Sequence, residues 1–372
     1  MAGVDVMSTT EVFINGLGLI GSSLARAIKK KKQEIVITAA DTDEETLNYA
    51  IANKIIDKAA RNFAAVKTAD IIILATPVDQ IIRTLHELSK LQLKPGVIIT
   101  DVGSTKQAVS KAAEELVQPT VTFIGGHPMA GSHKMGVTAG RADLFENAFY
   151  FLVAPKTKNE QVEKLQLLLQ ETNVKWFKID AGTHDTLVGQ ISHLPHIIAA
   201  TLVNRTQDEF SDSALGMKLA AGGFKSITRI ASSDPDMWSA ILKTNAAILT
   251  KQLAKYQQLL LEVQNDLSTG NQENLYNLFA QAKNSRDKLS NQKEYRLPNF
   301  YDLLVNIPDK LGVIARVTAL LAHNKINLVN LQILEIREEI DGVLQLTFMK
   351  ENDCEKAKEV LINQKYQIVE ER

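Results

Sequence analysis

The stretch Val12-Phe13-Ile14-Asn15-Gly16-Leu17-Gly18-Leu19-Ile20-Gly21 sets three glycines in the pattern GxGxxG directly after a short apolar run. The apolar run predicts a β-strand, and residues 22–32 are expected to form the helix that follows the turn. A second apolar run, residues 34–40, ends at Asp41, twenty positions after Gly21. This order of strand, turn, helix, strand and acidic residue predicts a dinucleotide-binding fold.

Each glycine has a separate physical task in such a turn. Gly16 allows the tight turn, Gly18 lets the backbone approach a pyrophosphate, and Gly21 lets the helix pack close to the strand. The pyrophosphate is then expected at the helix start, beside Leu19 and Ile20. The alternative is a glycine-rich structural turn in another α/β protein, which leaves the position of the acidic residue unexplained.

Asp41 predicts which cofactor binds. A carboxylate at the end of the second strand accepts a hydrogen bond from a ribose 2′-hydroxyl and repels a 2′-phosphate, and neither of the next two residues is an arginine. We therefore expect NAD rather than NADP. Thr76-Pro77-Val78 follows another apolar run, residues 71–75, and completes the expected cofactor-binding set.

Size and composition narrow the classes of protein. A chain of 372 residues is too long for one ordinary core, so we expect two or three domains. With 45% apolar and 23% charged residues and a formal net charge of −1, neither a nucleic acid nor a membrane is an expected partner. The single cysteine, Cys354, and the lack of zinc-ligand spacing indicate a cytoplasmic protein without a metal. Residues 1–10 resemble a disordered leader rather than a signal peptide, and no run reaches transmembrane length.

The first domain is expected over residues 11–180, with an α/β architecture. Short β-branched runs alternate with helical stretches there, which predicts a Rossmann-type, parallel, doubly wound sheet. The later strands are expected at residues 71–75, 97–101, 121–125, 148–154 and 176–179.

The second domain, residues 181–291, has helical periodicity and few strand signals. We expect an all-helical domain for substrate binding and dimerisation, because residues 237–267 carry enough apolar side chains to require another surface to cover them. A homodimer is therefore expected. The polar stretch 285–293 resembles a linker, which we assign to residues 292–298.

The third domain is expected over residues 299–372. Strands at 301–307, 328–336 and 342–349 and a helix at 313–324 fit the order β-α-β-β-α-β of a small ferredoxin-like domain.

His127 is the candidate catalytic base. It lies in Gly125-Gly126-His127-Pro128-Met129-Ala130-Gly131, at the end of an expected strand and at the sheet edge where a nicotinamide would bind. Neutral imidazole can accept the proton of a hydroxyl whose carbon loses hydride. The alternative is a turn histidine hydrogen-bonded to the backbone. If His127 is the base, the rate rises as it loses its proton, with an apparent pKa within about a unit of ~6.5.

Two further clusters lie in the helical domain. His184-Asp185 and Ser192-His193-Leu194-Pro195-His196 are expected to open a helix, where the dipole favours an anionic ligand. A core or capping role is the alternative for these histidines, and metal binding is a weaker one because no third ligand has suitable spacing. Arg229 lies between apolar residues, which indicates a partly buried guanidinium that binds a carboxylate. A structural salt bridge with Asp236 fits the spacing equally well.

These clusters, in this order behind a dinucleotide-binding fold, resemble the prephenate dehydrogenase family of tyrosine biosynthesis. The resemblance covers nearly the whole chain. The C-terminal segment resembles an ACT regulatory domain, with Gly312 and Asp309 in the loop that in such domains approaches an amino-acid effector. The motifs that carry the resemblance are Asp101-Val102-Gly103-Ser104-Thr105-Lys106, Gly126-His127-Pro128-Met129-Ala130-Gly131, Ser192-His193-Leu194-Pro195-His196 and Thr228-Arg229-Ile230-Ala231, with Asp234-Pro235 and Met237-Trp238.

The resemblance implies oxidative decarboxylation of prephenate to 4-hydroxyphenylpyruvate, with NAD+ taking the hydride and no metal required. His127 is then expected to accept the hydroxyl proton, and Ser104 to orient that histidine or the hydroxyl. Arg229 is expected to hold a substrate carboxylate and His193 to contact the pyruvyl side chain. Many relatives have glutamate where this chain has His133, which alters the charge near the substrate. The remaining residues expected at the substrate are His133, Lys225 and Trp238.

Several functions stay open beside a prephenate dehydrogenase inhibited by tyrosine. An arogenate dehydrogenase differs only in the substrate side chain, and Asp41 favours prephenate because arogenate-specific relatives often use NADP. A catalytically silent NAD-dependent amino-acid sensor belongs to a different class, and the joint presence of His127, Ser104, His193 and Arg229 argues against it. A β-hydroxyacid dehydrogenase usually has a catalytic lysine on its helical domain, for which Lys225 could be mistaken.

Overall fold

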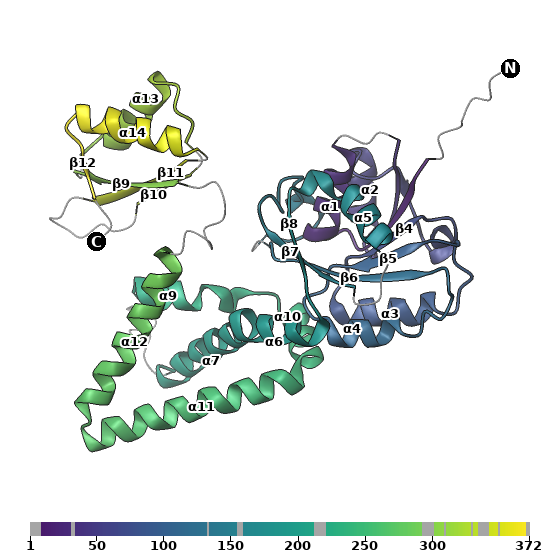
Figure 1. The fold of residues 1–372 in the computed structure, drawn as a ribbon, viewed down its shortest axis with the longest axis horizontal. Helices are drawn as coiled ribbons and strands as arrows, with labels where there is room; N and C mark the ends of the chain where they lie inside the picture. Colours follow the sequence, from purple (N-terminus) through teal and green to yellow (C-terminus); the bar gives the residue numbers. More distant parts are fainter. Residues whose placement is uncertain are drawn as a thin grey trace. The chain divides into compact units, whose positions relative to one another are not determined.

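The computed structural model describes residues 9–30, 34–131, 134–154, 159–211, 221–291, 301–308, 310–328, 330–333, 342–348 and 350–369. Two compact units make up the chain, residues 1–268 and 269–372 (Figure 1). Three of the expectations above lie outside the described residues, namely the roles of His133 and Asp309 and the linker at 292–298. Most of the expected leader lies outside them as well.

An eight-stranded sheet forms the centre of the first unit, in the order β3-β2-β1-β4-β5-β6-β7-β8. The strands from β3 to β6 are all parallel, which confirms the Rossmann-type, doubly wound arrangement. The strands are β1 Glu11–Asn15, β2 Val36–Ala40, β3 Lys58–Ala59, β4 Ile71–Leu74, β5 Ile98–Asp101, β6 Thr122–Pro128, β7 Phe149–Val153 and β8 Lys175–Lys178.

The expectation of a wholly parallel sheet is wrong at one edge. Strand β7 runs antiparallel to β6, and β8 is parallel to β7. A parallel neighbour requires a crossover, usually a helix, whereas the connection from β6 to β7 contains only the short 3-10 turn η2 Val137–Ala139 among its described residues. The chain therefore returns beside β6 in the opposite direction.

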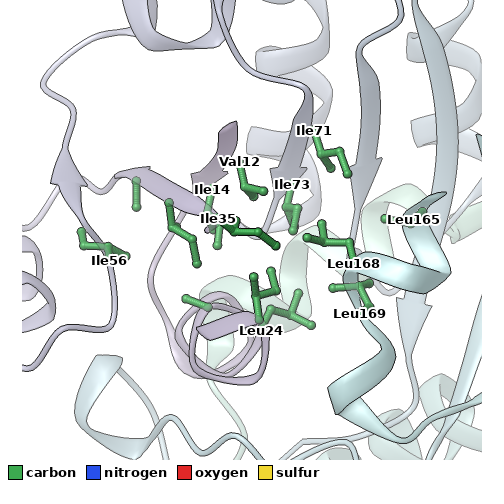
Figure 2. Packing of buried hydrophobic residues seen from close by; sticks show 14 of the residues in the cluster. Val12, Ile14, Leu24, Ile35, Ile56, Ile71, Ile73, Leu165, Leu168 and Leu169 are labelled. Carbon is green, nitrogen blue, oxygen red and sulfur yellow. The ribbon is translucent and has the colours of Figure 1, made fainter. Parts of the chain in front are cut away.

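The two faces of the sheet have separate cores, which follow from the two-residue period of the strands. In β1, Val12 and Ile14 point into one apolar cluster with Leu24 of α1 (Figure 2), whereas Phe13 belongs to the cluster on the other face. Burial of each such side chain contributes about 1.5–3 kcal/mol. The helices of this part are α1 Leu19–Lys29, α2 Glu44–Ala52, α3 Val78–Leu88, α4 Gln107–Ala113 and α5 Asn159–Leu168, with 3-10 turns η1 Phe63–Lys67 and η3 Gln170–Thr172.

The segment after β8 is helical, as expected. Ala240 of α10 is buried in the same cluster as side chains of α3 and α4, so α10 packs on one face of the sheet. Its elements are α6 Ala181–Val188, the π turn η4 Gly189–His193, α7 Leu194–Glu209, α9 Gly222–Thr228, the 3-10 turn η5 Arg229–Ser232, α10 Pro235–Thr244, α11 Ala246–Thr269 and α12 Gln272–Asn291.

Two expectations for the helical segment are wrong. Helix α12 continues to Asn291 and so occupies most of the polar stretch 285–293 that resembled a linker, because a polar composition fits an exposed helix as well as a linker. The helical run Ala181–Glu209 contains an 18-residue window with a mean hydropathy of 1.3, so by length and composition alone it could cross a membrane, although no run was expected to reach that length. It carries the buried, hydrogen-bonded pair His184 and Asp185, which fits contact with protein.

The ferredoxin-like domain lies in the second unit. Its four-stranded sheet has the order β10-β11-β9-β12, with antiparallel pairs, and the chain order β-α-β-β-α-β is confirmed. The inward residues of β9, Leu303, Val305 and Ile307, pack with α13 and α14. The elements are β9 Tyr301–Ile307, α13 Val313–His323, β10 Asn330–Ile333, β11 Gly342–Phe348, α14 Glu351–Asn363 and β12 Gln367–Ile368.

Candidate active site

The expected cofactor and catalytic residues gather at one edge of the first sheet. The parallel strands β2, β1, β4, β5 and β6 end at the same edge, and the strand order reverses between β1 and β4. Ligands of open α/β sheets bind outside the carboxyl ends of the strands at such a reversal. The glycine turn follows β1 and Thr76 follows β4, so both flank this position.

The surroundings of each of the three glycines in the turn fit the task expected of it. Gly16 has φ +94°, and a Cβ there would lie 2.7 Å from the carbonyl oxygen of Ala75. A Cβ at Gly21 would lie 2.0 Å from the carbonyl oxygen of Gly16, so helix and turn are in close contact. A Cβ at Gly18 would meet nothing within 4 Å, which leaves open space on the side where a pyrophosphate would lie.

The start of α1 fits an anionic group. The helix begins at Leu19, followed by Ile20, and the preceding residue Gly18 supplies no side-chain cap for the free N–H groups. Nearby, the hydroxyl oxygen of Thr76 is buried and has no hydrogen-bond partner among the described residues. Pro77 is exposed and Val78 is buried in the core. These features fit a dinucleotide, and NAD+ would find donors for its pyrophosphate here.

Asp41 lies directly after β2 and is held by the glycine turn. Its carboxylate accepts hydrogen bonds from the backbone N–H of Leu17 at 2.7 Å and of Asp43 at 3.0 Å. The side chain is partly exposed at the sheet edge. It can therefore keep its position while the remaining lone pairs face a ribose.

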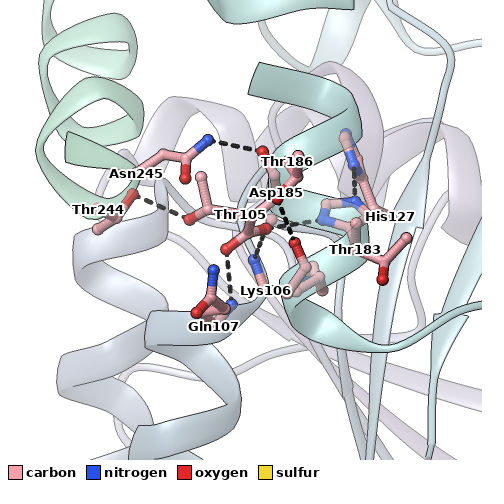
Figure 3. A network of polar contacts seen from close by, with 12 residues as sticks. Thr105, Lys106, Gln107, His127, Thr183, Asp185, Thr186, Thr244 and Asn245 are labelled. Atoms are coloured by element: carbon pink, nitrogen blue, oxygen red, sulfur yellow. Dashed lines mark hydrogen bonds and ion pairs between the residues drawn. The ribbon is translucent and has the colours of Figure 1, made fainter. Parts of the chain in front are cut away.

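His127 belongs to a row of hydrogen-bonded polar groups that joins the sheet to the helical segment. It lies on β6, and its Nδ1 is 2.9 Å from Nε2 of His184 on α6. The Nδ1 of His184 is 2.8 Å from a carboxylate oxygen of Asp185. Asp185 in turn accepts from the backbone N–H of Lys106 at 2.7 Å and of Gln107 at 2.8 Å (Figure 3).

The loop before α4 is fixed by a second buried carboxylate, Asp101. It pairs with the ammonium of Lys106 and accepts from the backbone N–H of Gly103 at 2.8 Å and of Gly126 at 3.1 Å. Both side chains of the ion pair are fully buried. Burial lowers the pKa of Lys106, and Asp101 opposes that shift. The end of β5, the loop and the strand that carries His127 are thereby held together.

The environment of His127 favours the neutral imidazole. Burial lowers its pKa well below the usual ~6.5, and the charges of His184, Lys106 and His193 act in the same direction. The shift is away from the reference value on which the expected apparent pKa was based, and the pH profile of the rate stays a prediction. The sequence could not reveal these neighbours, since they come from other elements.

A second group of rings lies around His193, which is almost fully buried. Its Nδ1 is 3.2 Å from the side-chain nitrogen of Asn245, which also donates to the carbonyl oxygen of Asp185. Burial lowers the pKa of His193 to about 4. The edge of Trp238 meets this ring at a centroid distance of 5.8 Å, and the same indole stacks on His196 at 3.7 Å. The indole N–H is buried without a partner among the described residues.

His184 and Asp185 lie near the start of α6, as expected, whereas the cluster around His193 lies at the junction with α7, inside one continuous helical run. The chain is helical from Ala181 to Glu209, and the π turn at Gly189–His193 accommodates Pro195 near the start of α7. A π turn inside an α-helix re-aims side chains and is frequent at functional sites.

The other expected residues are more exposed. Ser104 is partly exposed and has no hydrogen bond to His127 among the described contacts, since the bond at Nδ1 is with His184. Arg229 on η5 and Lys225 on α9 are exposed, so the expected partly buried guanidinium is wrong, as is its salt bridge with Asp236 within the described part of the chain. Ile227, one of the apolar neighbours of Arg229 in the sequence, is itself exposed and therefore does not bury the Arg229 side chain.

Sequence reasoning singled out His184 and Asp185 but did not connect them with His127, and it assigned no role to Asn245. The adjacent His-Asp pair was the available signal. Its partner is 57 residues away in the chain, so only the tertiary structure joins them.

Comparison with known proteins gives one family. Residues 24–178 match the family model "Prephenate dehydrogenase, nucleotide-binding domain", and residues 180–281 match "Prephenate dehydrogenase, dimerization domain". The chain is 40% identical over 352 residues to a prephenate dehydrogenase of Bacillus subtilis, covering 94% of this chain and 95% of that protein. It is also 40% identical to one of Lactococcus lactis, covering 94% and 97%.

Two solved structures are similar over three quarters of the chain. Prephenate dehydrogenase of Aquifex aeolicus, in complex with hydroxyphenyl propionate and NAD+, has a TM-score of 0.70 at 27% identity and covers 77% of this chain and 100% of that one. Arogenate dehydrogenase of Synechocystis has a TM-score of 0.64 at 31% identity and covers 75% and 99%.

Proposed function

The chain belongs to the prephenate dehydrogenase family, and from that premise we propose that it catalyses the NAD-dependent oxidative decarboxylation of prephenate to 4-hydroxyphenylpyruvate. One observation carries the proposal: His127, kept neutral by its surroundings, lies at the carboxyl edge of a nucleotide-binding sheet. A neutral imidazole at this edge can serve a reaction in which hydride leaves a carbon that bears a hydroxyl group.

NAD+ supplies the hydride acceptor when bound, and the residues Gly16, Gly18, Gly21, Leu19 and Ile20 would hold its pyrophosphate. Further cofactor contacts are assigned to Asp41 at the ribose and to Thr76, Pro77 and Val78.

In the chemical step, the protein acts on the hydroxyl hydrogen of the substrate. His127 accepts the hydrogen bond of the substrate hydroxyl, which raises the electron density on the carbon that loses hydride. The bond to the ring carboxylate breaks as carbon dioxide leaves, and its electron pair completes the aromatic ring. The hydroxyl hydrogen ends on the phenol oxygen, so His127 is neutral again after each turnover.

Replacement of His127 by asparagine tests this role. The expected result is a loss of turnover by about 10³-fold or more with NAD+ affinity changed by less than about threefold, since asparagine keeps a polar group of similar size but no basic nitrogen. His86→Asn, at an exposed histidine on α3, is the matched control and should keep the wild-type rate. Turnover of His127→Asn within a few fold of wild type would exclude His127 as the base.

The substrate side chain is assigned to the region of His193, with Trp238 beside it and Arg229, Lys225 and Ser104 as further candidate contacts. A near-neutral His193 can hydrogen-bond a keto group without adding charge. The 31% identity to an arogenate dehydrogenase favours arogenate as the second candidate. Formation of NADH from prephenate and from arogenate, each with NAD and NADP, separates the two, and a higher kcat/KM with arogenate would replace the first assignment.

Regulation by tyrosine is proposed for the ferredoxin-like domain, which has the fold of an ACT domain. A cavity of about 160 Å³ lies beside Gly312, which has φ +80° and directly precedes α13. Ile307, Lys310, Ile314 and Ile333 are among its lining residues, so an apolar side chain and a charged group could both bind there.

The effector site is tested with Gly312→Ala and a matched control. Alanine at a positive φ strains the loop, and we expect it to abolish inhibition by tyrosine while uninhibited turnover stays within about twofold. Gly270→Ala introduces the same strain at φ +67°, away from the cavity lining, and should leave inhibition intact. Unchanged inhibition in Gly312→Ala would refute this location.

A homodimer formed by the helical segment completes the proposal. Leu259, Leu260, Leu261 and Leu267 of α11 are exposed in the single chain, and this helix lies in the region that matches the dimerization model. Sedimentation at micromolar concentration should give twice the mass of 41.1 kDa. A monomer at that concentration would contradict the assignment. A cytoplasmic location remains a prediction.

A further inference from the structure

His127, His184 and Asp185 form a row of hydrogen bonds. Which atom donates in each bond can be worked out from the donors and acceptors in the row. Asp185 is fully buried, and the backbone N–H groups of Lys106 and Gln107 each donate to one of its carboxylate oxygens. A carboxylate offers only lone pairs to such donors. Its third partner, Nδ1 of His184, must therefore carry the hydrogen of that 2.8 Å contact.

The hydrogen on Nδ1 of His184 fixes the next step. When His184 is neutral, this is its single N–H and its Nε2 is an acceptor; a doubly protonated His184 would donate from Nε2 instead, and the tautomer of His127 distinguishes the two. The atom facing it at 2.9 Å is Nδ1 of His127, which must then be the donor. His127 consequently has its lone pair on Nε2.

We propose that His184 and Asp185 are positioning residues that hold His127 as the Nδ1–H tautomer, so that Nε2 is the acceptor for the reacting hydroxyl. This inference rests on the proposed function of His127 as the base. It assigns His184 and Asp185 a role in the reaction although neither needs to touch the substrate.

The groups around His127 are consistent with this assignment from every element that packs against it. His184 and Asp185 lie on α6, Lys106 precedes α4 and is neutralised by Asp101 of β5, and His193 lies on the π turn. Phe151 of β7 contributes an apolar ring, 6.4 Å from the imidazole centroid. Among these described neighbours the carboxylate of Asp185 is the one that selects the tautomer, because it acts through a hydrogen bond rather than through charge at a distance.

A purely structural role would use only part of this network. Asp185 already joins α6 to the start of α4 through the two backbone N–H groups, and Asn245 ties its carbonyl oxygen to the ring of His193. Those contacts do not require His184 to face His127. The tautomer of His127 is therefore the quantity that separates positioning from simple stabilisation.

The tautomer is measured directly by ¹⁵N NMR of the full-length protein labelled at histidine. Its 7 histidines give few signals, and His127→Asn identifies the signal of His127. We expect wild-type His127 to carry hydrogen on Nδ1 at pH 7.5, and Asp185→Ala to lose this preference, because no carboxylate then accepts from Nδ1 of His184. An Nε2–H tautomer in the wild-type protein would overturn the proposal, whether or not prephenate is turned over.

Kinetics supply the second readout. His184→Phe keeps the ring shape but offers no acceptor, and we expect kcat for prephenate to fall by about 10²–10³-fold while KM changes less than about threefold. His184→Gln can present its side-chain oxygen near the position of Nε2 and should recover at least tenfold of that loss. Equal rates for the phenylalanine and glutamine variants would refute a positioning role. His86→Phe on α3 is the matched control for ring replacement and should keep the wild-type rate.

Failure of the proposed function gives a different pattern. If wild-type protein turns over neither prephenate nor arogenate, the base assignment fails, whereas the NMR tautomer still decides the inference about His184 and Asp185.

Discussion

The loss of folding stability of the first unit at acidic pH should depend on His193. Burial lowers the pKa of this imidazole to about 4, although Asp185 opposes the shift, and its side chain is almost fully enclosed. The unfolded chain has the ordinary value of ~6.5 and therefore binds a proton at a higher pH than the folded chain does. Stability is fully present above about pH 6.5 and is lost as the pH falls toward the folded value.

The expected size follows from the two pKa values. Between pH 7.5 and pH 5 the unfolded state gains nearly a full proton at this site and the folded state gains almost none, which lowers the free energy of unfolding by about 2 kcal/mol. His193→Gln removes the titrating group and keeps an amide for Asn245. Between pH 7.5 and pH 5, the free energy of unfolding of the variant should therefore fall by about 2 kcal/mol less than that of the wild type.

The assay is urea unfolding at pH 7.5 and pH 5, at one protein concentration, followed by tryptophan fluorescence. The chain has 2 tryptophans, Trp176 and Trp238, and both lie in the first unit. His86→Gln, at an exposed histidine, controls for the loss of any histidine. Equal pH dependence in wild type and His193→Gln, within about 0.5 kcal/mol, would refute the reasoning.

Four further predictions concern the cofactor turn and the base. Gly21→Ala should lower thermal stability and abolish NAD+ binding, because its Cβ would lie 2.0 Å from the carbonyl oxygen of Gly16; calorimetry checks both. Gly18→Ala should fold with an unchanged melting temperature but bind NAD+ at least tenfold more weakly, and normal binding would show that the open space there is not used. Asp41→Asn keeps the acceptor for the turn but loses its charge, so the kcat/KM preference for NAD over NADP should fall by about tenfold or more; an unchanged ratio would remove Asp41 from cofactor selection. Because burial and neighbouring basic groups hold the pKa of His127 well below ~6.5, kcat/KM for prephenate should stay constant from pH 8 to pH 6 and decline only at lower pH, and a decline centred near pH 6.5 would contradict this.

Local patterns were reliable where one element decides the outcome. The GxGxxG turn after β1, the helical segment after residue 181 and the β-α-β-β-α-β order of the last domain all agree with the structure. Errors arose where the outcome depends on a distant neighbour. The direction of β7 depends on its pairing with β6, and the exposure of Arg229 depends on what packs over η5.

The sequence by itself determined the dinucleotide turn, because glycine conformations and the strand and helix periods are properties of neighbouring residues. It also determined the family, since motifs along nearly the whole chain carry that resemblance. Only the tertiary structure decided that His127 faces His184, that Asp185 is anchored by the start of α4, and that His193 is buried. These contacts join residues up to 79 positions apart. Hydrogen-bond direction and desolvation are set by such partners, so the protonation state of the base follows from the fold rather than from any local stretch.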